Sequence, residues 1–414
     1  MASRITLAKS VLSSIPLYPM LVGKILKGVC QEIERIQRDF IWGHDRSSNC
    51  YHPVGWDRLT RPKEYGGLGF RRLSSFNQVC RAKLAWNLVI GSNSLWADVL
   101  LNRYMMREGY SLLNYCLGNS KLWHFISSQK IIIDRGSKWH VRNGLSVNFF
   151  NDHWLLDGMG IKELCIRQIS TEEDVSLVSH WVKDGSWDFS KLADVVRPEV
   201  IQRLIVVIPP KVDASHDIIV WGATPNGKFS VKSVYFLIEV NPPNLRCNLF
   251  KHIWNWNGVE CIRVFLWRVA LQKLPTNEWR SCWSAHSGLC GYCNIESESI
   301  LHILRDCCYA HNMWLKLLKP NYVSQFFSAG LKDWLSMNLM GKLSKDMGLF
   351  WNLIFGVAVW MLWKWSNSFA FDPNFVKPRS PESFILHNWR NFSMYEELIP
   401  DPITQCLTSG EPRS

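Results

Sequence analysis

Charged residues, and acidic residues above all, are scarce in this sequence. Of its 414 residues 20% are charged, with 35 Asp and Glu against 47 Lys and Arg. With so few charges and 47% hydrophobic residues, the chain can bury enough apolar surface to order its backbone, which excludes a disordered tail protein. No low-complexity tract and no internal repeat is evident. The length therefore predicts two or three globular domains.

Long uncharged apolar segments are also missing. Met347 to Trp363 has no charge, but its 17 residues are at the lower edge for a membrane span, so we expect a buried core helix. Val11 to Gly23 slightly resembles a signal peptide, although Pro16 and Pro19 and the lack of a small-x-small cleavage site argue against one. We expect no membrane partner and an intracellular protein, with nucleus and cytoplasm left open.

Two motifs that could suggest ligand sites lack the necessary pattern. The glycines of Tyr65 to Arg72 have the wrong spacing for a phosphate loop, and no Lys-Ser or Lys-Thr pair follows, so they predict a turn. The acidic run Glu172-Glu173-Asp174 is more typical of a helix N-terminus or a solvated face than of a metal site.

Positive charge is concentrated at the N-terminus. Met1 to Tyr110 holds 16 basic and 8 acidic residues, a net charge of +8 out of +12 for the whole chain. Such a block attracts phosphate backbones without reading sequence, so we expect RNA or DNA as a partner and no small-molecule substrate. The alternative is that these charges only solvate helix faces. The candidate nucleic-acid-binding residues are Lys24, Lys27, Arg35, Arg38, Arg71, Arg72, Arg81 and Lys83.

Apolar periodicity predicts helices in this region. Apolar residues recur every three or four positions from Ile25 to Phe40, which predicts an amphipathic helix with a core face formed by Ile25, Val29, Ile33, Ile36 and Phe40. A second helix is expected from Ser74 or Ser75, either of which could cap it, toward Ile90.

Two segments show strand-like alternation. Lys138 to Trp154 alternates on both sides of Asn143-Gly144, which predicts a β-hairpin. A second such unit starts at Asp217, turns at Pro225-Asn226-Gly227 and leads into a helix near Ser233. With the helices, this indicates an α+β, mainly helical fold.

The cysteines include one group with ligand spacing. Cys290, Cys293, His302 and Cys307 form the pattern C-x2-C-x8-H-x4-C. Thiolates and an imidazole suit tetrahedral Zn²⁺, and four protein ligands leave no position for a reacting water, so we expect structural zinc. Cys282 or Cys308 could replace one ligand, and His311 is a weaker substitute. The alternative is a chance grouping among 13 Cys.

Aromatic residues surround this group in the sequence. Some could stack on nucleic-acid bases, but such residues more often form core. They are Trp254, Trp256, Phe265, Trp267, Trp279 and Trp314.

These residues carry a resemblance to a known family. Ser230 to Tyr235, Phe265 to Arg268, Leu274 to Thr276 and the Cys-Cys-His-Cys set are similar to the reverse-transcriptase zinc-binding domain of plant LINE-type (non-LTR) retrotransposons, often labelled "putative ribonuclease H protein". Ile5 to Met20, Phe40 to Gly43, Pro62 to Phe70, Asn77 to Trp86 and Gly136 to Trp154 extend the similarity upstream.

The resemblance implies a division of the chain. It predicts a helical thumb or connection-like region over 1–110, a connecting region with a β-hairpin over 111–215 and the zinc-binding domain over 216–320. A helical linker would cover 321–372 and precede a ribonuclease H domain, and 373–414 would be a poorly ordered tail.

Departures from the family bear on catalysis. Its polymerase uses two adjacent aspartates to hold metal ions, and this sequence contains no Asp-Asp pair; only 51 residues follow Trp363. We therefore expect a non-catalytic zinc-binding protein that associates with nucleic acid. The alternatives are a fragment of a polymerase and ribonuclease H polyprotein, and a translated pseudogene without a selected function.

Overall fold

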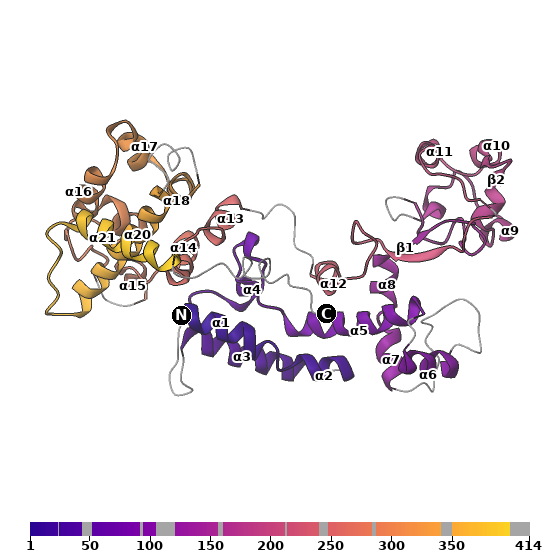
Figure 1. Cartoon of the computed structure of the whole chain (residues 1–414), viewed down its shortest axis with the longest axis horizontal. Helices are drawn as coiled ribbons and strands as arrows, with labels where there is room; N and C mark the ends of the chain where they lie inside the picture. Colours follow the sequence, from indigo (N-terminus) through magenta and orange to yellow (C-terminus); the bar gives the residue numbers. More distant parts are fainter. Residues whose placement is uncertain are drawn as a thin grey trace, which may run out of the picture. The chain divides into compact units, whose positions relative to one another are not determined.

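Helices dominate the structure and strands are few and short (Figure 1). The computed structural model describes residues 1–23, 25–43, 52–91, 94–104, 121–155, 160–211, 213–239, 247–283, 287–340 and 350–397. They form two compact units. Unit 1 comprises Met1–Ser13, Arg35–Phe70 and Pro243–Ser414, and unit 2 comprises Ser14–Glu34 and Arg71–Pro242. The expected α+β, mainly helical fold is confirmed.

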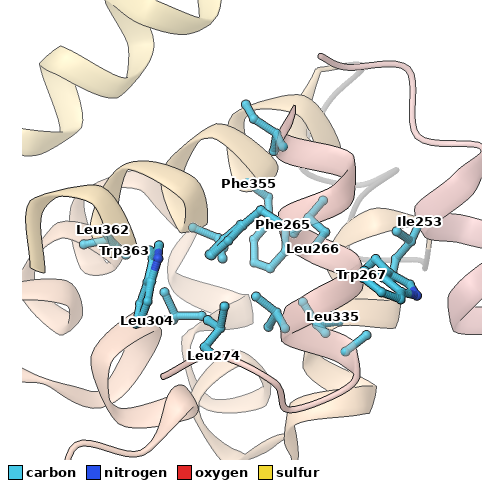
Figure 2. Close-up of a cluster of buried hydrophobic side chains, with 14 of the residues drawn as sticks. Ile253, Phe265, Leu266, Trp267, Leu274, Leu304, Leu335, Phe355, Leu362 and Trp363 are labelled. Atoms are coloured by element: carbon cyan, nitrogen blue, oxygen red, sulfur yellow. The ribbon is translucent and has the colours of Figure 1, made fainter. Parts of the chain in front are cut away.

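Unit 1 is helical and has one hydrophobic core. Figure 2 shows its centre, where Phe265, Leu266 and Trp267 of one helix pack beside Phe355 of another. Burying each such side chain contributes roughly 1.5–3 kcal/mol. Its main elements are α1 (Ala2–Leu7), η1 (Ala8–Leu12), α4 (Trp56–Leu59), η2 (Lys63–Tyr65), α13 (Asn248–Trp254), α14 (Glu260–Ala270), α15 (Asn277–Ser281), η6 (His302–Asp306), α16 (Cys308–Leu317), η7 (Pro320–Tyr322), α17 (Val323–Ser328), α18 (Leu331–Leu339), α20 (Trp351–Phe371) and α21 (Pro381–Glu397).

Helix α20 contains the uncharged stretch noted in the sequence. Its side chains Phe355, Ala358 and Val359 are 0% exposed, because α14, α18 and α21 pack against it. Gly356 leaves space for the Trp256 ring, whose indole N–H donates to the Asn352 carbonyl at 2.9 Å. The expected buried helix is confirmed. In the described part of the chain, no helix combines the length and apolarity that crossing a membrane requires.

Part of the segment predicted as a poorly ordered tail, 373–414, is a helix in the structure. Helix α21 packs on α20, Ile385 is 0% exposed, and Lys316 pairs with Glu382 at 2.9 Å. Polar residues lie between its apolar ones, so the composition of this segment did not predict a helix. Packing stabilises the helix. Residues 398–414 lie outside the described residues.

Unit 2 contains helices, short strands and separate cores. In one core the ring of Trp86 lies edge-on to Trp221 at 5.2 Å and stacks on Phe229 at 5.6 Å. In another, Phe149 stacks on Trp181 at 4.7 Å. The elements are α2 (Leu17–Val22), α5 (Leu73–Val89), α6 (Leu95–Tyr104), α7 (Lys121–Ser127), α8 (Lys130–Gly136), β1 (Ser137–His140), η3 (Ile161–Leu164), α9 (Thr171–Asp174), η4 (Val178–Trp181), β2 (Val182–Lys183), β3 (Ser186–Trp187), α10 (Phe189–Ala193), α11 (Pro198–Ile205), β4 (Ile218–Trp221) and α12 (Val231–Ile238).

The hairpin predicted over Lys138 to Trp154 is wrong. Strand β1 pairs antiparallel with β4, with Ser137 opposite Trp221. With the following residues it forms no ladder, although the Trp139 N–H donates to the His153 carbonyl at 2.8 Å. The Asn143-Gly144 turn exists, but the Asp217 carboxylate holds it by accepting the backbone N–H groups of Arg142, Asn143 and Gly144 at 2.6–3.1 Å. Alternation identifies a strand but not its partner, and here the partner is distant in sequence.

The second predicted unit is half correct. Strand β4 forms as expected, and α12 begins after Ser230, whose hydroxyl caps the helix by accepting the Ser233 N–H at 3.1 Å. The segment after the turn is not a strand. The Trp221 N–H donates to the Gly227 carbonyl, which closes a tight loop there.

Helix α3 (Lys27–Trp42) is present, but its buried face differs from the predicted one. Val29 is 48% and Ile36 is 42% exposed, whereas Cys30, Gln37 and Ile41 are each 1% exposed. The packing of α3 therefore selects a face rotated by one residue. Gln37 is tolerated inside because its amide donates to the Leu12 carbonyl at 3.2 Å.

Helix α5 confirms the second predicted helix but not its cap. Its N-cap residue is Arg72, without a side-chain cap. The Ser75 hydroxyl instead donates to Glu239 at 2.5 Å, and Glu34 accepts the Leu73 N–H at 2.6 Å. The Glu34 carboxylate, distant in sequence, thus takes over what a local serine cap would do.

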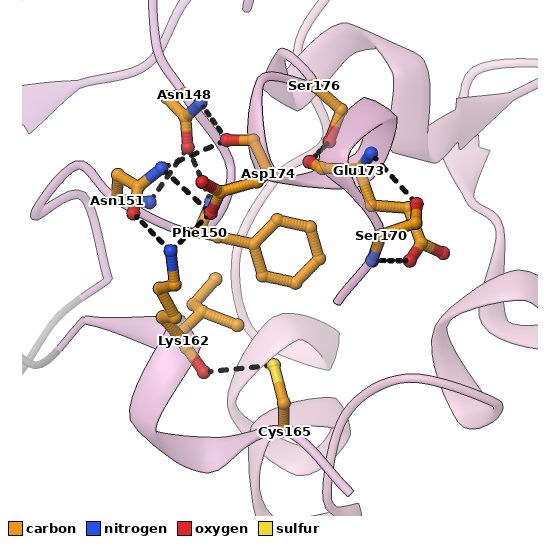
Figure 3. A network of polar contacts seen from close by, with 10 residues as sticks. Asn148, Phe150, Asn151, Lys162, Cys165, Ser170, Glu173, Asp174 and Ser176 are labelled. Carbon is orange, nitrogen blue, oxygen red and sulfur yellow. Dashed lines mark hydrogen bonds and ion pairs between the residues drawn. The ribbon is translucent and has the colours of Figure 1, made fainter. Parts of the chain in front are cut away.

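The acidic run and the glycine turn have the expected structural roles. Figure 3 shows the capping box of α9, in which Ser170 and Glu173 satisfy each other's backbone N–H groups. The Arg167 guanidinium lowers the pKa of Glu173 to about 2, and Asp174 pairs with Lys162 at 2.5 Å. In the turn, Gly66 has φ +79°.

Candidate metal centre

The centre is formed by a tight turn and the start of two helices in unit 1. Cys290 and Cys293 flank the turn, in which the Asn294 N–H donates to the Cys290 carbonyl at 2.8 Å. Asn294 itself has φ +52°. His302 is the first residue of η6, and Cys307 is the N-cap residue of α16. The Cys307 N–H donates to the His302 carbonyl at 2.7 Å, which fixes the second pair of side chains.

The structure brings the four predicted ligands together. Their ligand atoms all lie within 4.8 Å of one another. The sulfur atoms of Cys290 and Cys307 are 3.7 Å apart, and the Cys293 sulfur is 3.4 Å from Nε2 of His302. Ligand atoms about 2.0–2.3 Å from a tetrahedral zinc are separated by roughly 3.3–3.8 Å, so these contacts fit the ion.

Glu296 positions the histidine. Its carboxylate lies 2.9 Å from Nδ1 of His302, on the ring nitrogen opposite the one that faces Cys293. A carboxylate in this place accepts the Nδ1–H, keeps Nε2 available for the metal and raises the basicity of the ring. The Glu296 carbonyl also accepts the Cys290 N–H at 2.8 Å. One residue therefore links the turn and the histidine.

The environment favours thiolates. The contact with Cys307 lowers the pKa of Cys290, and the backbone N–H groups of Cys293 and Tyr292 act in the same direction. Backbone N–H groups of Glu296 and Ile295 lower the pKa of Cys293. The contact with Cys290 raises the pKa of Cys307. Cys290 and Cys293 thus readily lose their thiol protons, as metal binding requires, whereas Cys307 keeps its proton next to the Cys290 thiolate.

The pKa of His302 is raised. Burial is the largest single influence and lowers it, but hydrogen bonds to Cys290 and Cys293 outweigh burial. His302 is 5% exposed, and Cys290 and Cys307 are 0% exposed. Cys293 is half-buried. Because four protein ligands leave no position for a reacting water, the site has the character of a structural rather than a catalytic zinc centre.

The alternative ligands lie outside the group. Cys282 and Cys308 are both exposed, and the Cys282 thiol contacts the Glu278 carbonyl at 3.5 Å. The His311 ring packs on Phe327 at 4.1 Å. Neither Cys282, Cys308 nor His311 belongs to the cluster of ligand atoms.

Two acidic residues also belong to the site. Sequence reasoning missed Glu296 and Glu298, although a carboxylate between the second and third ligands is a usable signal. Glu298 accepts the Asn277 N–H at 3.1 Å, and its burial raises its pKa.

The neighbouring aromatics are mainly core, as preferred from the sequence: Trp256, Phe265, Trp267 and Trp314 are at most 3% exposed.

The predicted nucleic-acid-binding residues fall into different environments. Lys27 and Lys83 are exposed. Arg35 pairs with Asp39 at 2.9 Å and belongs to unit 1 with Arg38, and Arg72 lies 3.6 Å from Glu239. Lys24 lies outside the described residues.

Three cations gather around one buried thiol of α5. The charges of Lys83, Arg71 and Arg81 all act on Cys80 and lower its pKa, against a larger effect of burial that raises it. Arg71 lies over the Phe76 ring at 4.6 Å and Arg81 over Phe125 at 4.8 Å. We call Arg71, Arg81 and Lys83 the α5 basic cluster.

Comparisons with known proteins agree with the geometry of the centre. Residues 229–314 match the family model described as zinc-binding in reverse transcriptase. Together with the Cys290, Cys293, His302 and Cys307 cluster, this match assigns structural zinc to the chain.

Two proteins of Arabidopsis thaliana are similar to the chain. A "putative ribonuclease H protein" is 30% identical over 403 residues, which are 94% of this chain and 64% of that protein. An uncharacterized mitochondrial protein is 26% identical over 147 residues, which are 35% of this chain and 94% of that protein. The chain thus spans less than two thirds of the longer relative. The resemblance to the reverse-transcriptase zinc-binding domain and to plant proteins labelled "putative ribonuclease H protein" is confirmed, and the LINE subtype stays a prediction.

Proposed function

Because this chain is a retrotransposon-derived protein that carries the reverse-transcriptase zinc-binding domain, we propose that it binds single-stranded nucleic acid without sequence preference and without catalysing a reaction. Zinc holds the core of unit 1 together. The α5 basic cluster in unit 2 supplies charge for phosphates. The name of the longer relative refers to ribonuclease H, and this chain spans 64% of that protein.

The observation that carries the binding proposal is the α5 basic cluster. Three cations lie close enough to Cys80 to lower its pKa, so they create a local positive potential there. Arg71 and Arg81 lie over aromatic rings, which orders their guanidinium groups. Preordered cations lose less side-chain entropy when they bind a phosphate.

The binding test uses the whole chain. Residues 1–110 are not a unit of the fold, because α12 packs on α5 from later in the sequence. Single-stranded RNA is titrated at low and moderate salt, and affinity should fall steeply with salt because binding releases counterions. Replacing Arg71, Arg81 and Lys83 by Gln should reduce the log–log salt slope by about 0.7 for each lost contact.

A matched variant separates this cluster from general charge. Lys183, Lys211 and Lys228 are exposed lysines elsewhere in unit 2, and their replacement by Gln removes the same charge. That variant should keep most of the affinity. An affinity that ignores salt, or that drops equally in both triple variants, contradicts a role of the α5 basic cluster and leaves the charges as solvating groups.

The absence of catalysis is the second part of the proposal. The sequence has no Asp-Asp pair, and within the described residues the group suited to a metal is the Cys₃His cluster rather than a set of carboxylates. Two-metal phosphoryl chemistry needs carboxylates that hold ions about 3.5–4 Å apart. The 414 residues by themselves should give background signal on a primed template and on an RNA–DNA hybrid with Mg²⁺. Activity that survives stringent purification and tracks the protein through columns would favour the enzyme-fragment alternative.

A further inference from the structure

A pocket lies beside the zinc turn in unit 1. It is formed by α15, by the turn residues Gly291 and Tyr292, and by the last turns of α20. Its volume is about 100 Å³. Pockets that enclose a drug-sized molecule have about 300–1,000 Å³, so this one can seat only part of a ligand, such as the edge of one planar ring. Since Gly291 and Tyr292 stand between Cys290 and Cys293, the zinc site shapes one wall.

The walls of this pocket are aromatic. Tyr292, Trp363, Phe369 and Phe371 all line it. The rings of Tyr292 and Phe369 have centroids 5.0 Å apart. Phe369 is 41% and Phe371 is 66% exposed, so both present ring surface to solvent. Exposed rings at the mouth of a pocket are suited to stacking on a planar heterocycle.

Two cations lie over these rings. The Lys377 ammonium is 4.0 Å from the ring centroids of both Tyr292 and Phe369. The Arg280 guanidinium is 5.1 Å from the Phe371 centroid, and Arg280 itself lines the pocket. Positive charge next to stacking surface matches a ligand that is both anionic and aromatic.

Polar groups also face the pocket. The Tyr292 hydroxyl is buried and has no hydrogen-bond partner among the described residues, and a buried polar atom without a partner is uncommon in native proteins. Glu298, 6% exposed, lines the pocket with Asn277, to which it is hydrogen-bonded at 3.1 and 3.2 Å. Asn277 and Glu298 line the pocket, and their side-chain oxygens can meet the edge of a base.

We propose that this pocket binds one nucleotide of a single strand, with its base against the exposed ring surface of Phe371, next to Phe369, and its phosphate on Arg280 and Lys377. The proposal rests on the nucleic-acid binding proposed above and adds a second contact in a different unit. It gives the zinc centre a role beyond stability, because zinc holds Tyr292 in the wall of the pocket.

The experiment uses the zinc-loaded whole chain and two probes. Single-stranded RNA carrying 5-iodouridine is cross-linked by light, and the modified peptides are identified by mass spectrometry. Binding of AMP, GMP, CMP and UMP is measured separately by saturation-transfer NMR. We expect cross-links at Tyr292, Phe369 or Phe371, and saturation transfer to the base protons of at least one monophosphate.

Two variants and two controls test the assignment. Phe371→Ala should weaken RNA binding about tenfold, since stacking on one base contributes roughly 5- to 150-fold. Arg280→Gln should lower the salt slope by about 0.7. Phe189→Ala, at a 40% exposed ring in unit 2, and Lys332→Gln, at an exposed lysine of α18, should change neither. Zinc content and melting temperature are measured for every variant to verify folding.

The outcomes separate this proposal from the proposed function. RNA binding with cross-links only in unit 2, and no monophosphate binding, overturns the pocket and leaves the α5 basic cluster intact. Monophosphate binding that is lost in Phe371→Ala or Arg280→Gln supports the pocket even if the chain binds no RNA. Unchanged binding in both folded variants also overturns it.

Discussion

The zinc ligands differ sharply from neighbouring residues of the same type. Cys307 is 0% exposed inside the ligand cluster, whereas the adjacent Cys308 is exposed and outside it. The position of a thiol relative to the helix start therefore decides whether it is a zinc ligand. Cys307 is the N-cap residue of α16, and Cys308 already belongs to the helix. A thiol one position away cannot replace the ligand without changing the helix start.

We expect Cys307→Ser to abolish stoichiometric zinc binding. Serine is a poor ligand for Zn²⁺, and structural zinc contributes roughly 10–16 kcal/mol to the folding of small domains. Elemental analysis of the purified protein and its thermal melt are the measurements. Cys308→Ser is the control and should retain about one zinc per chain. Equal zinc content in both variants would show that Cys307 is not a ligand.

The carboxylate of Glu296 offers a second test at this scale. Glu296→Gln leaves the four ligands intact but weakens the hydrogen bond to Nδ1 of His302. Loss of such a partner typically reduces metal affinity 10- to 100-fold. Competition with a chromophoric chelator measures the change. Glu278→Gln, at an exposed position on α15, should have no effect; a similar loss in both variants would argue against the positioning role.

Helices of this protein depend on packing more than on propensity. Helix α20 places Gly356 in its interior, where glycine costs about 1 kcal/mol relative to alanine. The structure explains the glycine: a Cβ there would lie 2.3 Å from the Trp256 ring. Helix α3 shows the reverse case, because Gly28 has no atom within 4 Å of an added Cβ.

Alanine at these two glycines should therefore act in opposite directions. Gly356→Ala should lower the free energy of unfolding by about 1–3 kcal/mol, since it overpacks a core in which Trp256 is 2% exposed. Gly28→Ala should raise it by about 0.5 kcal/mol through helix propensity and a less flexible unfolded chain. Denaturant titrations measure both. Stabilisation by Gly356→Ala would mean that Trp256 does not pack where the structure has it.

At the scale of the whole molecule, zinc belongs to one unit only. The core of unit 1 contains Cys290 and Cys307 together with α14, α16 and α20. The cores of unit 2, around Trp86 and Trp221 and around Phe149 and Trp181, contain no zinc ligand. The free energy of zinc binding therefore adds to the stability of unit 1. It does not add to the stability of the cores of unit 2.

Chelation should unfold unit 1 selectively. Treatment with a strong chelator should abolish hydrogen-exchange protection of amides in α14, α16 and α20, while amides of the paired strands β1 and β4 keep theirs. Hydrogen exchange followed by mass spectrometry resolves these peptides. Re-addition of zinc should restore protection. Simultaneous loss in β1 and β4 would contradict the separation into two units.

Local features were predictable from the sequence. The zinc ligands lie within one short segment, so their spacing is sufficient to bring them together around a turn and two helix starts. Structural zinc and the mainly helical α+β class follow from such local patterns, as do the turn at Gly66 and the role of Glu173 at the N-terminus of α9. These depend on hydrogen bonds and ligand geometry between near neighbours.

Features that join distant residues required the tertiary structure. β1 pairs with β4, about eighty positions away, because Gly136 has no Cβ and admits the Trp221 ring. The buried face of α3 and the helical α21 are likewise set by the surfaces that pack on them, which periodicity and composition do not specify. The sequence by itself determined the ligand set and the helical character of this protein. Tertiary packing alone decided which strand, helix face and aromatic rings meet, because burial depends on neighbours that lie far apart along the chain.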